Sequence, residues 1–122
     1  MTTAPTPPAA WETLETALRQ RRPIHVTYHG RQRLICPHAL GWNNTRPLLL
    51  AYQTGGDTHT GTLPADPRNR WRCLFIDEIN NVTPAEPTSK WATADNYNPA
   101  RPFNNNTEIT IAIPPNDQPP GR

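Results

Sequence analysis

The stretch WETLETALRQRRPIHVTY, residues 11–28, contains the change of pattern that decides the fold. Before Pro23 the apolar residues recur at spacings of three and four, which is the period of one helix face: Trp11, Leu14, Ala17 and Leu18. Glutamates near the beginning of this segment and arginines at its end suit the helix dipole, and proline stops the helix. After Pro23 the period is two, with apolar residues at 24, 26 and 28. The sequence therefore predicts a helix at 11–22 and a strand at 24–28.

Further short strands are expected after this one. His29-Gly30 indicates a tight turn, and RQRLIC (31–36) is the return strand of a hairpin, which Pro37 ends. A wide connection, ALGWNNT, then leads to the next strand. The remaining elements expected are a strand at 48–53, a long loop at 54–70, a strand at 71–76, a helical turn at 77–80 and a short strand at 81–84.

Three leucines, Leu48, Leu49 and Leu50, stand in a row in the central strand. Leucines on both faces of one strand imply that both faces are covered. In a small domain this fits a strand with the barrel interior on one side and a helix on the other. The fold class predicted for residues 11–83 is mainly β: a small SH3-like or Sm-like barrel of about five strands with an N-terminal helix.

The prolines separate the two ends of the chain from this domain. Of 16 prolines, three lie in residues 1–10 and eight lie from Pro84 onward. Residues 1–10 are expected to be a disordered lead, and 84–122 a Pro/Asn-rich tail that also ends in disorder. Within the tail, ITIAI (109–113) alternates as a further strand does. Three isolated aromatic residues punctuate it: Trp91, Tyr97 and Phe103.

The composition is polar, with a mean hydropathy of -0.76 and a formal net charge of +2. Lys90 is the only lysine among 12 basic residues. Arginine presents a planar fork that suits phosphate and carboxylate and stacks on aromatic rings. The alternative is that the arginines form an ordinary solvated surface. A core of about 73 residues is marginal by itself, which favours a protein partner or an oligomer.

The location predicted for the protein is the cytoplasm. The first residues, MTTAPTPPAAW, have neither a basic segment nor an apolar one of the kind found in signal peptides. No apolar run approaches 18 residues, so no membrane span is expected. Cys36 and Cys73, each inside an apolar segment, are expected to be buried free thiols rather than a disulfide.

The string ALRQRRPIHVTY…PHAL…LLLAYQTGG…WRCLFIDEINNV, within residues 14–83, resembles the WYL domain, an Sm/SH3-like β-barrel with an N-terminal helix. NYNPARPF (96–103) is similar to the tail of small stand-alone members. The positions that carry the resemblance are Tyr28, Pro37, Leu40, Tyr52, Arg72, Asp77 and Ile79. The Trp-Tyr-Leu that names the family falls on Pro47, Leu48 and Leu49. Phe75 and Glu78 stand where the family often has arginines.

The resemblance implies a regulatory ligand sensor whose ligand is a nucleic acid or a nucleotide-like molecule. WYL domains usually follow a DNA-binding winged helix in bacterial transcription regulators, and this chain lacks the residues for one. We therefore expect it to act through a partner or a homodimer, and to bind single-stranded nucleic acid or a nucleotide. The candidate ligand-binding residues are Tyr28, Arg31, Arg33, His38, Gln53, Trp71 and Arg72.

The roles expected within this set rest on position. Arg31 and Arg33 lie two apart on one strand and hence on one face, and Arg33 with Arg72 would hold phosphate. Gln53 and His38, just beyond strand ends, would supply hydrogen bonds. The aromatic residues would form a stacking surface. For the tyrosines at 28 and 52 the favoured interpretation is instead a place in the core, because both continue an apolar alternation.

Other classes of function have less support in the sequence. Cys36-Pro-His38 and Asp57-Thr-His59 supply metal-ligand types, but the paired spacings of zinc sites are lacking, and no cofactor is expected. No catalytic motif occurs, so the protein is not expected to be an enzyme. The competing hypothesis is a purely structural protein–protein interaction module, whose tail aromatics dock on another protein.

Overall fold

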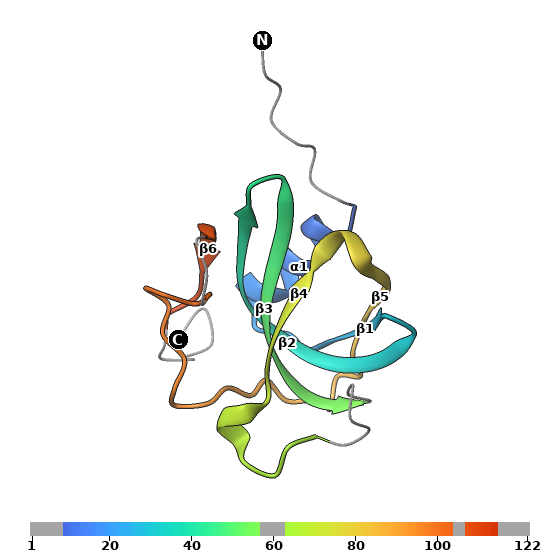
Figure 1. Cartoon of the computed structure of the whole chain (residues 1–122). Helices are drawn as coiled ribbons and strands as arrows, with labels where there is room; N and C mark the ends of the chain where they lie inside the picture. Colours follow the sequence, from blue (N-terminus) through green and yellow to red (C-terminus); the bar gives the residue numbers. More distant parts are fainter. Residues whose placement is uncertain (1–8, 57–62, 104–106, 115–122) are drawn as a thin grey trace.

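The structure, a computed structural model, describes residues 9–56, 63–103 and 107–114 (Figure 1). The helix and strands are α1 (Ala9–Gln20), β1 (Ile24–Tyr28), β2 (Arg31–Asn43), β3 (Arg46–Gly56), β4 (Trp71–Phe75), β5 (Ile79–Pro84) and β6 (Glu108–Ala112). Two 3₁₀ turns flank β4: η1 (Pro67–Asn69) and η2 (Ile76–Glu78). The prediction of a mainly β chain with one N-terminal helix is confirmed.

The six strands form one antiparallel sheet. The order along it is β4-β3-β2-β1-β5, and β6 pairs with the second half of β2. β4 and β5 are the two ends of this order, and no pairing within the described ranges joins them. The sheet is therefore open, and the closed barrel expected from the sequence is not confirmed.

The first hairpin and the helix agree closely with their predictions. His29 and Gly30 both have positive φ, 52° and 75°, as a two-residue turn between twisted strands requires. The helix begins two residues earlier than expected, at Ala9, so the end of the expected disordered lead is helical; residues 1–8 lie outside the described part. It ends at Gln20, because Arg21 adopts a φ of 52° and the Arg22 amide donates to the Ala17 carbonyl.

The expectation that Pro37 ends a strand is wrong. β2 continues through Pro37 to Asn43, and the predicted wide connection shrinks to a turn at Asn44, whose φ is 56°. Pro37 lies between the part of β2 that pairs with β1, up to Ile35, and the part that pairs with β6, from Ala39. A register shift in the pairing with β3 occurs at the same place. A missing amide donor does little harm at a bulge of this kind.

The three leucines of β3 are buried, as predicted, with exposed fractions of 2%, 0% and 8% for Leu48, Leu49 and Leu50. Leu49 belongs to the main core on the inner face of the sheet, which we define as the face that packs against α1. Leu48 and Leu50 belong to a smaller cluster on the opposite, outer face, together with Phe103. The expected arrangement is corrected: the helix covers the inner face, and the tail covers the outer one.

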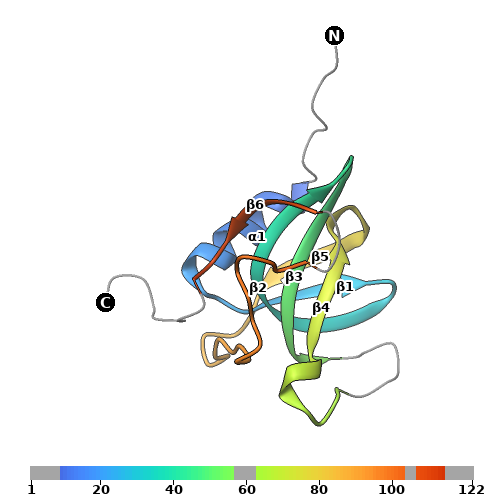
Figure 2. The same cartoon turned by 60° about the vertical axis from the view of Figure 1, so that its left-hand side comes forward.

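The tail between β5 and β6 has neither helix nor strand in its described residues, and it folds back over the sheet. Figure 2 shows this orange segment running beside β2 and β3. The His38 carbonyl accepts hydrogen bonds from the Ile113 amide (3.0 Å) and from the Tyr97 hydroxyl (3.3 Å). β6 begins and ends one residue before the strand predicted at 109–113. Residues 115–122 lie outside the part of the chain that the structure describes.

Candidate functional site

The structure divides the seven predicted ligand-binding residues between the two faces of the sheet. Opposite residues in an antiparallel pair share a face. Arg33 pairs with Val26, and Arg72 pairs with Ala51, and both of these partners lie in the inner core. The inner-face set is Tyr28, Arg31, Arg33, Gln53 and Arg72. The outer-face set is His38 and Trp71, which pack with the tail.

Arg33 lies in the interior, with only 6% of its surface exposed. Its guanidinium carbon is 5.4 Å from the centroid of the Tyr28 ring, a cation–π geometry. Tyr28 is itself 7% exposed, and its hydroxyl oxygen accepts a hydrogen bond of 3.2 Å from the Phe75 amide. Burial is the main cause that raises the pKa of the Tyr28 phenol. Tyr28 is therefore a core residue that supports Arg33, and it offers no exposed stacking face.

Arg72 and Gln53 are joined by a hydrogen bond. The Arg72 Nε donates to the Gln53 Oε1 at 3.2 Å, and the Gln53 Nε2 donates to the Gly55 carbonyl at 3.0 Å. Gln53 is fully buried, whereas Arg72 is half-buried. Burial lowers the pKa of the Arg72 guanidinium, although arginine stays charged at neutral pH. Gln53 thus holds Arg72 in place, and Arg72 keeps contact with solvent.

Arg31 lies opposite Tyr28 at the beginning of β2 and is half-buried. The inner face therefore carries three arginines, of which Arg31 and Arg72 are reachable from solvent and Arg33 is not. In Figure 1 the end of β3 and the start of β4 lie low in the view, and α1 lies behind the upper half. We call Arg31, Arg33 and Arg72 the inner arginines.

His38 occupies the centre of an aromatic cluster on the outer face. Its ring centroid lies 4.7 Å from that of Trp71, 4.8 Å from that of Trp91 and 4.9 Å from that of Tyr97. The ring nitrogens contact the Cys36 carbonyl at 2.7 Å and the Thr93 hydroxyl at 3.0 Å. With 1% of its surface exposed, His38 anchors the tail to β2. His38 and Gln53 lie on opposite faces of the sheet, so they do not form one site as the sequence predicted.

A depression of about 270 Å³ lies beside Trp71 on the outer face. Its lining includes Arg68 and Arg101, which the sequence analysis did not single out. The signal for Arg68 was present in RNRWR (68–72), where arginines at 68, 70 and 72 surround a tryptophan. Arg101 could not be found in this way, because the folding of the tail brings it to β4.

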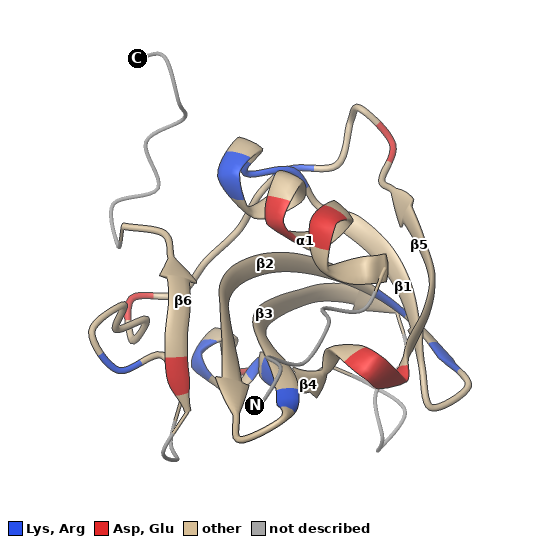
Figure 3. Ribbon diagram, turned by 90° about the horizontal axis from the view of Figure 1, so that it is seen from above, with Lys and Arg blue, Asp and Glu red and all other residues tan. Residues whose placement is uncertain are grey.

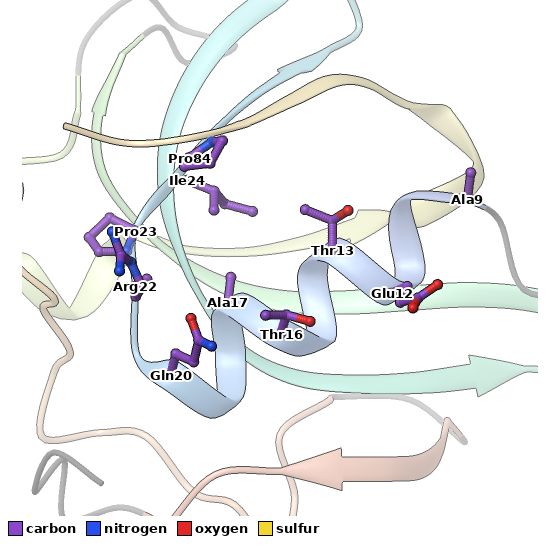
Figure 4. A pocket seen from close by; sticks show the side chains of 10 residues that line it. All are labelled: Ala9, Glu12, Thr13, Thr16, Ala17, Gln20, Arg22, Pro23, Ile24 and Pro84. Carbon is purple, nitrogen blue, oxygen red and sulfur yellow. The ribbon is translucent and has the colours of Figure 1, made fainter. Parts of the chain in front are cut away.

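Another hollow lies along α1. It is a groove of about 560 Å³ between the helix and the strands β1 and β5, and its lining mixes apolar residues with polar ones such as Thr13, Thr16 and Gln20 on the helix side (Figure 4). Figure 3 shows the basic residues spread over several elements rather than gathered on one face. Several arginines are also neutralised locally: Arg46 by Asp77 and Glu78, and Arg68 by Asp95. The net positive charge therefore does not mark one site.

Neither cysteine forms a disulfide, as predicted, but only Cys36 is buried; Cys73 is exposed because its side chain is on the outer face of an end strand. Burial raises the pKa of the Cys36 thiol to about 11, and the Ala92 amide donates to its sulfur at 3.4 Å. His38 contacts the Cys36 carbonyl rather than this sulfur. The part of the chain that the structure describes holds no cluster of three metal-ligand side chains, and Asp57 and His59 lie outside that part. Within the same ranges no helix is both long and apolar enough to cross a membrane.

Comparison of the chain with protein-family models, with curated proteins and with solved structures finds no match. The resemblance to the WYL domain stays a prediction from the sequence.

Proposed function

We propose that this protein is a non-catalytic, WYL-like ligand-binding module that binds single-stranded nucleic acid or a nucleotide through the inner arginines. The observation that carries the proposal is the common face of Arg31, Arg33 and Arg72, which stand on two different strands. Guanidinium groups recognise phosphate well, because each offers a planar fork of donors.

The three arginines have different tasks in this proposal. Arg31 and Arg72 are half-buried and contact the phosphates directly. Arg33 is held against the Tyr28 ring, and its positive charge attracts the phosphates without direct contact. Gln53, which accepts the hydrogen bond from Arg72 Nε, restrains the arginine before the ligand arrives. Such preorganisation lowers the entropy cost of ordering the Arg72 side chain on binding.

We further infer that the open sheet is a variant of the SH3-like architecture. Five strands follow the order β4-β3-β2-β1-β5, so β5, the last of these five along the chain, pairs with β1, the first. A single 3₁₀ turn, η2, separates β4 from β5. The long second strand, which pairs with β1 along its first part and with β6 along its second part, supports this inference.

The non-catalytic part of the proposal is supported by the state of the strongest nucleophile candidate. A thiolate is the reactive form of cysteine, and the buried Cys36 resists deprotonation. The regulatory output would pass through a partner protein or a homodimer in the cytoplasm. The alternative of a purely structural interaction module loses its main support, because Trp91, Tyr97 and Phe103 pack on this chain's own sheet.

The experiment is fluorescence anisotropy with labelled single-stranded and double-stranded oligonucleotides of the same sequence. We expect the single strand to bind at low salt and Arg31→Ala and Arg72→Ala to weaken that binding. Arg22→Ala is the matched control, because Arg22 is an exposed arginine beside the groove of α1 and not on the inner face. Circular dichroism verifies that each variant is folded. Absence of binding at low salt, or equal losses for Arg22 and the inner arginines, would refute the proposal.

A further inference from the structure

We propose that the depression beside Trp71 is a nucleotide subsite, in which a base stacks on aromatic side chains and the phosphate binds Arg101. This inference deepens the proposed function and rests on it for the class of ligand. The site itself is separate from the inner arginines, because it lies on the outer face of the sheet.

One part of the lining is a pair of aromatic rings, which gives the depression a flat stacking surface. Trp71 and Tyr97 are stacked, with ring centroids 5.4 Å apart and planes at 22°, and both are half-buried. The Trp71 indole donates to the Asn96 Oδ1 at 2.8 Å, and the Tyr97 hydroxyl donates to the Ile113 carbonyl at 2.8 Å. Two aromatic residues fixed by hydrogen bonds suit a flat ring, because neither side chain must be ordered on binding.

The rim supplies one positive charge. Arg68 is paired with Asp95 through bonds of 2.8 and 2.9 Å, so these two groups neutralise each other. Arg101 is exposed, and its guanidinium has no partner among the residues that the structure describes. The Asn98 Oδ1 accepts from the Ala100 amide, which leaves its Nδ2 as a donor. A cation and an amide donor beside an aromatic platform select an anionic ligand with a planar ring.

The size of the depression limits the ligand. About 270 Å³ lies just below the range of roughly 300–1,000 Å³ that is typical of pockets for drug-sized molecules. One nucleotide unit fits this space better than a longer segment does.

The position of Trp71 connects the subsite to the inner arginines. Trp71 and Arg72 are consecutive residues of β4, which ends the sheet, so their side chains lie on opposite faces of one edge. A single strand that crosses this edge can place a phosphate on Arg72 and a base on Trp71. Readers of single strands commonly combine cationic contacts to the backbone with aromatic stacking.

The test is a titration of the full chain with adenosine 5′-monophosphate, adenosine and inorganic phosphate, followed by NMR. The Trp71 indole signal is assigned with a Trp71→Phe variant, and the Asn98 side-chain amide serves as a second reporter. We expect adenosine 5′-monophosphate to shift both signals. Arg101→Ala should weaken its binding about tenfold and leave the weaker binding of adenosine unchanged, since only the charged hydrogen bond is lost. Arg46→Ala, which removes a charge elsewhere on the surface, is the control and should change nothing.

The outcomes separate this inference from the proposed function. If adenosine 5′-monophosphate leaves the Trp71 and Asn98 signals unmoved, or if Arg101→Ala binds it as the wild type does, the subsite is refuted. Oligonucleotide binding that depends on Arg31 and Arg72 can persist in that case. If the mononucleotide binds here but oligonucleotide binding ignores those two arginines, the proposed function fails and the subsite stands.

Discussion

Gly41 is the residue on which the docking of β6 depends most directly. It stands in β2 opposite Ile109, where β2 and β6 approach closely. A Cβ atom at Gly41 would lie 2.5 Å from the Glu108 carbonyl oxygen and 2.9 Å from Thr107 Cγ2. The first of these contacts is with backbone, which cannot turn aside as a side chain can. We therefore predict that Gly41→Ala displaces β6 from β2.

The expected magnitude follows from the kind of clash. Overpacking of a close contact costs about 1–3 kcal/mol. For a domain of this size about 1 kcal/mol lowers Tm by roughly 4–8 °C. The loss should be concentrated in β6 and the tail, because the two closest contacts of the added Cβ are with Thr107 and Glu108, where β6 begins. The inner core would lose its contacts with Ile111 and Ile113, but the part built on α1 and the other strands should remain folded.

The assay is hydrogen exchange of the amides in β6, combined with thermal unfolding. Gly55→Ala is the matched control: a Cβ there would meet Leu34 at 3.5 Å, an ordinary contact, and Gly55 does not have a positive φ. The same change of residue in a strand should cost little at this position. The reasoning would be refuted if Gly41→Ala kept wild-type protection in β6, or if both variants lost stability equally.

Two further predictions concern titration and reactivity. Hydrogen bonds from His29 and then Arg46 lower the pKa of the Glu78 carboxyl below its usual 4.5. Its folded pKa therefore lies below the unfolded one, so its contribution to stability is complete above about pH 4.5 and disappears as pH falls through the folded value. Glu78→Gln should flatten the acid limb of a stability–pH curve; an unchanged limb would contradict this. In the native protein iodoacetamide should modify the exposed Cys73 well before the buried Cys36, as measured by mass spectrometry. Equal rates of modification would contradict this and would show that the tail segment at Ala92 does not protect Cys36.

The local part of the fold was predictable because local rules govern it. The switch of period at Pro23 located α1 and β1, and His29-Gly30 located the hairpin turn. The leucine run marked a strand with two covered faces. The strand end predicted at Pro37 was wrong, since the prediction rested on the rule that proline usually ends a strand with neighbours on both sides. Here Pro37 lies between the part of β2 that pairs with β1 and the part that pairs with β6. The sequence alone did not reveal this, because β6 lies more than 70 residues further along the chain.

The candidate site was predictable only in part. Alternation along a strand correctly placed Arg31 and Arg33 on one face. The same rule forbids Trp71 and Arg72, which are consecutive in β4, from sharing a face, so the predicted set could have been divided from the sequence alone. His38 could not be placed in that way, because the register shift in β2 lies beside it. Its partners come from the tail, whose path no periodicity reveals.

The central claim is that Arg31 and Arg72, with the buried charge of Arg33 near them, bind the phosphates of a single strand. The most direct measurement is the slope of log K against log salt for oligonucleotide binding. Each phosphate neutralised on a single strand contributes about 0.7 to this slope, and two or three contacts imply a loss of roughly tenfold in affinity between 50 and 200 mM salt. The combined variant Arg31→Ala/Arg72→Ala should lower the slope by about 1.4. A folded double variant whose slope equals that of the wild type would contradict the account.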